Sequence, residues 1–291
     1  MTVRHLVQVT DTHLSRTHAY FVDNWEVFVA EMQADPPDLI VWTGDVSLRG
    51  SDEEADLAFA RGQIERLPVP VLVLPGNHDI GDPPPSPRLE RPVTEERLAR
   101  WERQFGPGWW AQNFAGWRLY GLNAQIFGSG LEAEAEQYRF FESALADGAG
   151  RPGMLFTHKP VFYADPEDPR TFNHAVLCLE GRQRILDLCR AHDVRVIASG
   201  HLHYYRTAQF GGIDLIWAPA TAFINSKIKD RPHVDVERCI GYLRFRFDGA
   251  TVSHTVGRSS EFTIHDLMKF DDYPGSTHFL PPRPLAGADT P

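Results

Sequence analysis

Short apolar runs alternate with amphipathic, helix-like stretches along the first two thirds of the chain. The apolar runs are rich in Val, Ile and Leu and end at Gly, Pro or polar residues, which is the pattern of buried strands. They cover residues 5–10, 38–43, 69–74, 153–157 and 194–199, and the helix-like stretches cover 22–34, 51–66, 132–146 and 180–191. This alternation predicts an α/β architecture in which helices cover the faces of a sheet.

The predicted helix at 51–66 carries a local signal for its first turn. Ser51 is followed three residues later by Glu54, which is the spacing of a capping box. We therefore expect the first turn of this helix to begin at Ser51.

The alternation of apolar runs and helix-like stretches ends after residue 203. Four short segments follow one another, and Gly-containing turns at Gly211-Gly212 and Asp248-Gly249 join them in pairs. Such turns between apolar segments are hairpin signals. We expect antiparallel strands that form a second sheet packed on the first, at 204–209, 213–218, 240–247 and 250–256.

Two segments fall outside this pattern. Residues 81–117 hold a run of prolines and then four tryptophans. They form either a cap over the active site or a contact surface for another subunit, or else a long loop whose aromatic side chains pack on their own domain; we favour the loop. Residues 271–291 contain five prolines and are expected to be an extended tail. The predicted division is one domain over residues 1–270 and a Pro-rich tail over 271–291.

Composition and charge narrow the class of protein. The 291 residues are 42% hydrophobic and 23% charged, with a formal net charge of −10, which argues against a nucleic-acid partner or an anionic membrane surface. Three cysteines without CxxC spacing indicate reduced thiols. No apolar run approaches the ~20 residues of a membrane span, and the first strand leads directly into a motif. We expect a cytoplasmic protein, and a homo-oligomer is compatible with the sequence.

Five polar motifs follow the five apolar runs, each where a predicted strand ends. In open α/β sheets, this edge is where separate strands bring ligands to one crevice. A lone His or an Asp-x-His is weak evidence, but five motifs in this order make coincidence improbable. The motifs are Asp11-Thr12-His13, Gly44-Asp45, Gly76-Asn77-His78-Asp79, His158 and Gly200-His201-Leu202-His203.

The residue types in these motifs indicate a metal centre. Imidazole, carboxylate and amide groups without thiolate suit Mn, Fe, Co or Zn, whereas Mg and Ca prefer oxygen ligands. Two divalent ions, the Asp11 and Asp45 carboxylates and one bridging hydroxide leave a charge of about +1. An anionic phosphoester is the ligand that such a site attracts.

The motif set resembles the calcineurin-like metallophosphoesterase family over residues 5 to about 210, and within it the class III cyclic-nucleotide phosphodiesterases. The resemblance implies two packed mixed β-sheets flanked by helices, a four-layer αββα sandwich, with two divalent or mixed-valence ions at the sheet edge. It assigns one ion to Asp11, His13, Asp45 and His203, and the other to Asp45, Asn77, His158 and His201. Asn77 and His78 would bind the phosphate, and Asp79 would orient His78.

The expected function is hydrolysis of a small phosphodiester, such as a cyclic nucleotide, by in-line attack of a metal-bridging hydroxide. His78 would also protonate the leaving alkoxide. The alternatives within the family are a phosphomonoesterase, a protein serine/threonine phosphatase and a nuclease. From another class, a non-catalytic binding scaffold is the remaining alternative, although the motif set lacks none of its ligands.

For several further polar residues we favour an ordinary solvated or structural position over a role in the site. His174 and His233 lie in predicted loops that could reach the substrate, and Lys159 follows His158. Tyr204 either lines the pocket or begins the next strand. The stretch 220–238, with Asn225, Lys227, Lys229 and Arg231, could contact a charged substrate, but a solvated loop is its simpler interpretation.

Overall fold

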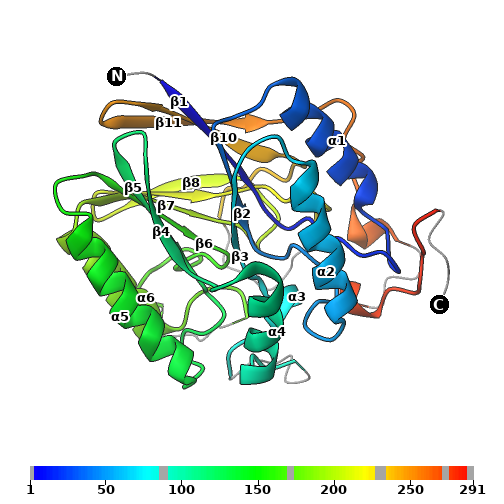
Figure 1. The fold of residues 1–291 in the computed structure, drawn as a ribbon, viewed down its shortest axis with the longest axis horizontal. Helices are drawn as coiled ribbons and strands as arrows, with labels where there is room; N and C mark the ends of the chain where they lie inside the picture. The colour runs from blue at the N-terminus through cyan, green and yellow to red at the C-terminus, as the bar shows by residue number, and fades with distance from the viewer. Residues whose placement is uncertain (1–2, 85–90, 169–173, 227–233, 271–274, 287–291) are drawn as a thin grey trace.

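Two mixed β-sheets lie face to face, and helices cover the outer face of each (Figure 1). This computed structural model describes residues 3–84, 91–168, 174–226, 234–270 and 275–286. The predicted four-layer α/β sandwich is therefore confirmed.

The first sheet has five strands, and β1 lies at its centre. Strands β1, β2 and β3 are parallel because the helices α1 (Val22–Ala34) and α2 (Glu54–Gln63) connect them by crossovers. The 3₁₀ turn η1 (Ile64–Arg66) follows α2. The strand order is β11 (Thr251–Gly257), β10 (Tyr242–Asp248), β1 (Arg4–Val9), β2 (Leu39–Thr43) and β3 (Val71–Leu74).

The second sheet has six strands. Helices α5 (Glu132–Asp147) and α6 (Leu179–Ala191) connect β5 to β6 and β6 to β7, which makes these three strands parallel. β4 and β8 are its antiparallel edge strands. The order is β4 (Trp110–Phe114), β5 (Trp117–Leu122), β6 (Gly153–Thr157), β7 (Val194–Ser199), β9 (Ile213–Trp217) and β8 (Arg206–Phe210).

The strands after residue 203 do not form a sheet of their own, so our prediction of their grouping was wrong. The hairpin β8–β9 extends the six-stranded sheet, where β9 pairs with β7. The hairpin β10–β11 extends the other sheet, because β10 pairs with β1 from Arg4 opposite Phe247 to Gln8 opposite Leu243. Hairpin signals define strand neighbours within a pair but not the sheet that each pair joins.

Residues 95–117 contain more regular structure than the long loop that we favoured. Helix α4 (Glu95–Phe105) begins with the Thr94 side chain accepting a hydrogen bond from the Arg97 backbone N–H, and β4 follows it. Trp101 and Trp117 are each only 1% exposed and belong to the core. The tryptophans thus pack on their own domain. Part of the Pro-rich run, residues 85–90, lies outside the described residues.

The capping box predicted at Ser51 does not form. Helix α2 begins at Glu54 without a side-chain cap, and the Ser51 hydroxyl has no hydrogen-bond partner in the part of the chain that the structure describes. Tertiary contacts use the Ser51 backbone instead: its N–H donates to the His78 carbonyl at 2.8 Å, and its carbonyl accepts from Arg97 Nε at 2.7 Å.

Three apolar clusters fill the spaces between the layers. One lies between the two sheets, and it includes Leu6, Val41, Phe156 and Phe245. A second packs α1 and α2 against the first sheet, where Trp25 stacks on Trp42 at 4.6 Å between ring centroids. The third packs α5 and α6 against the second sheet. These clusters hold the ends of the buried strands in fixed positions.

The C-terminal part of the chain returns to the N-terminal loop. After the 3₁₀ turns η2 (Leu267–Lys269) and η3 (Thr277–Phe279), residues 280–286 run beside residues 16–20. Residues 271–274 and 287–291 of the predicted tail lie outside the described residues.

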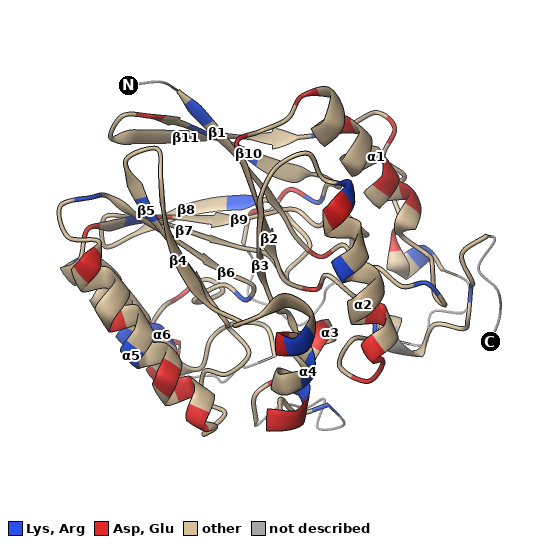
Figure 2. Ribbon diagram, viewed as in Figure 1, with Lys and Arg blue, Asp and Glu red and all other residues tan. Residues whose placement is uncertain are grey.

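Charged residues are distributed without a uniformly basic element in the part of the chain that Figure 2 colours. Acidic residues mark α5, and basic residues are spread over several elements. Within the described residues, no helix is long and apolar enough to cross a membrane.

Candidate metal centre

The five motifs meet at one end of the sandwich, beyond the carboxyl ends of β1, β2 and β3 in the first sheet and of β6 and β7 in the second. Three overlapping groups have ligand atoms within 4.8 Å of one another. Asp11 and Asp45 both belong to two of these groups, whereas the family resemblance shares only Asp45. The groups are Asp11, Asp45, His158 and His201; Asp11, His13 and His203; and His13, Asp45 and His78.

Most of the predicted ligands have an unusual backbone conformation. Five of the seven lie in the left-handed region, which costs non-glycine residues of order 1–3 kcal/mol each and clusters at functional sites. Backbone hydrogen bonds between the motifs stabilise it, such as the one from the His13 N–H to the Asp45 carbonyl at 3.0 Å. The five are Asp11 (φ 52°), His13 (47°), Asp45 (46°), His201 (69°) and His203 (54°).

The Asp45 carboxylate lies between the two predicted ligand sets. Its Oδ1 accepts a hydrogen bond from the His78 backbone N–H at 2.8 Å. Its Oδ2 is 3.7 Å from His13 Nε2 and 3.4 Å from His158 Nε2. Although burial alone would raise it, the neighbouring imidazoles of His158 and His78 hold the pKa of Asp45 well below its usual value. The group is thus ionised and lies within 4 Å of an imidazole from each predicted ligand set.

Asp11 has one satisfied and one unsatisfied oxygen. Oδ2 accepts hydrogen bonds from the Thr10 hydroxyl at 2.7 Å and from the His201 backbone N–H at 2.8 Å. Oδ1 is buried and accepts no hydrogen bond from the described residues, although His203 Nε2 is 3.2 Å away. Because a buried carboxylate oxygen without a donor is costly, this atom fits a cation-binding role.

Three of the four predicted histidine ligands direct one ring nitrogen at a backbone carbonyl. Since a carbonyl only accepts, that nitrogen carries a proton, and in the neutral ring the other one keeps its lone pair. Although burial opposes it, the Asp45 and Asp11 carboxylates raise the pKa of His158 to about 9, so a cation would displace a proton there. His158 Nδ1 donates to the Thr43 carbonyl at 2.8 Å, leaving its Nε2 at 3.1 Å from His201 Nδ1. His201 Nε2 donates to the His174 carbonyl at 2.6 Å, and His203 Nδ1 to the Phe223 carbonyl at 2.8 Å. This arrangement fixes the tautomers that metal ligation requires.

His78 is oriented differently from our prediction, which made Asp79 its partner. His78 Nδ1 donates to the Leu48 carbonyl at 2.7 Å. The Asp79 carboxylate instead accepts from the Gly76, Val46 and Ser47 backbone N–H groups at 2.8, 3.2 and 2.9 Å, and from the Ser47 hydroxyl. Burial, together with the charge of Asp45, raises the pKa of Asp79 to about 7. Asp79 thus holds the motif loops together, and the Leu48 carbonyl positions His78.

Several residues for which we did not favour a functional role lie beside the site. His174 and Asn225 line the pocket over the predicted ligands. Lys159 is buried and forms a 2.7 Å ion pair with Asp82, so it is not a solvated loop lysine. Tyr204 is 2% exposed and belongs to the core beside α5 and α6. His233 and the stretch with Lys227, Lys229 and Arg231 lie outside the described residues.

No sequence motif indicated Phe223, which contacts two of the predicted ligands. Its ring lies 4.1 Å from the His203 ring and 4.9 Å from the His13 ring, between centroids. Leu48, Leu267, Ser276 and Thr277 were also unexpected near the site. These residues follow no local motif, because only the tertiary fold brings them to the ligands.

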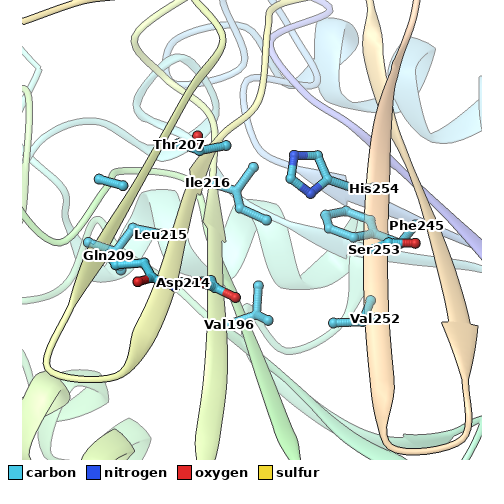
Figure 3. A pocket seen from close by; sticks show the side chains of 11 residues that line it. Val196, Thr207, Gln209, Asp214, Leu215, Ile216, Phe245, Val252, Ser253 and His254 are labelled. Carbon is cyan, nitrogen blue, oxygen red and sulfur yellow. Dashed lines mark hydrogen bonds between the residues drawn. The ribbon is translucent and has the colours of Figure 1, made fainter.

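The pocket over the ligands has a volume of about 90 Å³ and a mainly polar wall. A separate cavity of about 370 Å³ opens between the edge strands β8 and β11 (Figure 3). Val196, Ile216 and Phe245 line that cavity together with His254, whose pKa is lowered by burial. None of the seven predicted ligands lines it, so the chemistry of the motifs belongs to the smaller pocket.

Fold and donor cluster together define a metal-dependent phosphoester hydrolase, and comparison with known proteins agrees. The model of calcineurin-like phosphoesterases matches residues 4–205, and the chain belongs to this family. A probable cyclic nucleotide phosphodiesterase of Rhodococcus erythropolis is 27% identical over 90% of this chain and 82% of its own. A probable glycerophosphodiester phosphodiesterase of Arcobacter nitrofigilis is 26% identical over 73% of this chain and 77% of its own.

Solved structures agree on the fold. A purple acid phosphatase from yellow lupin has a TM-score of 0.68 at 15% identity; the match covers 91% of this chain and 53% of that enzyme, so this chain matches about half of its length. A dimetal phosphatase from Danio rerio has a TM-score of 0.56 at 13% identity, with 88% and 96% covered. At these identities the likeness concerns the architecture alone.

Proposed function

We propose that this chain is a dinuclear-metal phosphodiesterase that hydrolyses a small phosphodiester such as a cyclic nucleotide. One observation carries the proposal: all three overlapping donor groups lie at the same end of the sandwich, where strands of both sheets end, with two ionisable carboxylates shared between them. Imidazole and carboxylate donors without thiolate suit Mn or Fe, with Zn or Co as alternatives. The names of two curated relatives as diesterases support the choice of a diester.

Within this proposal, two ions would supply positive charge for the phosphoester and a water of lowered pKa as nucleophile. The protein residues do the positioning. Asn77 Oδ1 is 3.3 Å from His158 Nε2, which places the amide beside the second ligand set. His78 lines the pocket and its Nδ1 donates to the Leu48 carbonyl; in this proposal its ring would contact a phosphoryl oxygen through Nε2 and pass a proton to the leaving alkoxide.

The phosphatase alternatives differ from a diesterase in the substituents on the phosphorus of the substrate. A phosphomonoesterase or a protein serine/threonine phosphatase would use the same donor cluster, and only the pocket wall would distinguish them from a diesterase. A non-catalytic scaffold would need the cluster to bind metal without turnover. Among the described residues, no observation favours any of these three alternatives over the diesterase.

The test compares two ester types on metal-loaded protein. We expect Mn-loaded protein to hydrolyse bis-p-nitrophenyl phosphate faster than p-nitrophenyl phosphate. His201→Ala should abolish turnover and lower the bound metal content, whereas His192→Ala, an exposed histidine at the end of α6, should change neither. Turnover of the monoester alone would favour a phosphatase. Two bound ions without turnover would favour the scaffold, and less than one ion per chain would contradict the donor assignment.

A further inference from the structure

Part of the pocket wall comes from a segment far from every motif. Ser276 and Thr277 line the pocket together with His13, Asn77 and His203. They belong to residues 275–286, which we call the C-terminal strap, and which lie beyond the family match at 4–205. We propose that the strap is the substrate-selecting wall of the site and that the Thr277 hydroxyl hydrogen-bonds an oxygen of the bound phosphoester. This inference rests on the proposed function.

Backbone hydrogen bonds attach the strap to the loop that follows the first motif. The Ala19 N–H donates to the Arg283 carbonyl at 2.8 Å, and the Arg283 N–H donates to the Thr17 carbonyl at 2.9 Å. The Leu285 N–H donates to the Arg16 carbonyl at 2.9 Å, and the Tyr20 hydroxyl to the Pro281 carbonyl at 2.9 Å. Because this loop begins just after His13, the strap is tied to an element that carries ligands.

An apolar anchor continues this attachment down to the ligands. Leu280 is 5% exposed and packs in a small cluster with Phe21, Phe223 and Leu267. The Phe21 and Phe223 rings lie 4.9 Å apart, and both lie against the His13 ring, at 6.4 and 4.9 Å between centroids. Displacing the strap would therefore expose apolar surface beside the ligands, which opposes its release.

Thr277 is the strap residue placed to contact a ligand. It is only 4% exposed and lines the pocket. Among the described residues its hydroxyl has no hydrogen-bond partner, and because the hydroxyl is not fully buried it is open to a ligand in the pocket. A substrate oxygen would satisfy the hydroxyl, and an anionic phosphoester offers several acceptors.

The size of the enclosed space determines what the wall selects. Its volume of about 90 Å³ is far below the roughly 300–1,000 Å³ of pockets that enclose a whole drug-sized ligand. The pocket would therefore hold little more than the ions and the phosphoryl group, and the substituents of the ester would extend past its wall. A narrow substituent passes the strap, whereas a wide one requires the strap to move.

The first experiment separates the Thr277 hydroxyl from its shape. Thr277→Val keeps the shape and removes the hydroxyl, whereas Thr277→Ser keeps the hydroxyl and removes a methyl group. Calorimetry with Mn-loaded protein would measure the affinity for inorganic phosphate, beside the KM for bis-p-nitrophenyl phosphate. We expect Thr277→Val to lower the affinity for phosphate about tenfold and to raise the KM about tenfold. Thr277→Ser should keep both values within about twofold of those of the unmodified chain. A packing role predicts the reverse order and would overturn the hydrogen bond.

The second experiment loosens the anchor. Leu280→Ala should raise the kcat/KM for bis-p-nitrophenyl phosphate relative to that for methyl p-nitrophenyl phosphate several-fold. Leu67→Ala, a control at a leucine that is 8% exposed and packs beside α1 and α2, should leave the ratio unchanged. An unchanged ratio in Leu280→Ala with a retained thermal transition would overturn the selecting wall. Phosphate binding without turnover of any ester would contradict the proposed function, and the Thr277 pair would still decide the hydrogen bond.

Discussion

His203 contacts Phe223 twice: its Nδ1 donates to the Phe223 carbonyl at 2.8 Å, and the two rings lie 4.1 Å apart between centroids. The hydrogen bond fixes which ring nitrogen faces the ligand cluster, and the ring contact fixes the tilt of the imidazole. The same phenyl ring also touches His13 and belongs to the cluster that anchors the strap. One side chain outside every motif thus supports both a ligand set and the pocket wall.

Phe223→Ala should therefore weaken metal binding without removing a ligand. The backbone carbonyl remains, but both imidazoles lose the ring that orients them, and changes to such supporting contacts lower metal affinity roughly 10–100-fold. Titration of the metal-free protein with Mn in a calorimeter measures the effect. Phe59→Ala, on α2 and packed on the cluster beneath that helix, is the matched control and should leave the affinity unchanged. Equal affinities for both variants would contradict the supporting role.

Asp79 and His78 should differ in what their substitution affects. Asp79→Asn places amide hydrogens against several donors, so we expect the free energy of unfolding to fall by about 2–3 kcal/mol. His78→Asn should leave stability nearly unchanged and lower kcat roughly 10²–10⁴-fold, as expected for loss of a proton donor. Urea unfolding and diester turnover, measured on both variants, separate the two roles. A stable but inactive Asp79→Asn would restore the role of orienting His78 that we first assigned to Asp79.

Gly76 leaves no room for a side chain. A Cβ atom at this position would overlap the Asp45 carboxylate and backbone nitrogen, so Gly76→Ala must displace the shared ligand. We expect loss of metal binding and destabilisation by roughly 2–4 kcal/mol. Gly62→Ala in α2 is the control. A Cβ added at Gly62 meets no atom within 4 Å, and the free energy of unfolding should rise by about 0.5–1 kcal/mol. Metal content and thermal unfolding measure both variants, and normal metal binding by Gly76→Ala would refute the steric argument.

Asp56 should make stability depend on pH. Burial raises its pKa from 3.8 to about 6, although the Ser15 hydroxyl donates to it at 2.8 Å. Between these values the folded protein keeps a proton that the unfolded chain has released, so the contribution of Asp56 to stability falls as the pH rises through this window. Asp56→Asn removes the titration.

The free energy of unfolding of Asp56→Asn, relative to the unmodified chain, should therefore rise by about 2 kcal/mol from about pH 4 to about pH 7. Urea unfolding at both pH values measures this double difference, in which the other titrating groups cancel. A difference independent of pH would show that Asp56 ionises as freely in the folded protein as in the unfolded chain.

The sequence predicted the elements whose information is local. The buried strands β6 and β7 begin and end where the apolar runs do, and the helices α1, α5 and α6 differ from their predicted bounds by at most one residue. The motifs were equally clear, since each follows a strand directly. Features that depend on distant partners were missed: the Ser51 backbone is used by His78 and Arg97, and the His78 partner is Leu48. The sheet that each late hairpin joins was missed for the same reason.

The position of β1 has a consequence for the order in which the molecule can be completed. β1 is synthesised before the other strands, but one of its two neighbours, β10, lies near the end of the chain. The pairing of Arg4 with Phe247 can therefore form only after β10 has been made. The six-stranded sheet uses residues 110–217 only and can form earlier. Such distant pairing slows folding. The strap follows β10 and β11 in the chain, so its hydrogen bonds to residues 16–20 can form only after those strands have been made.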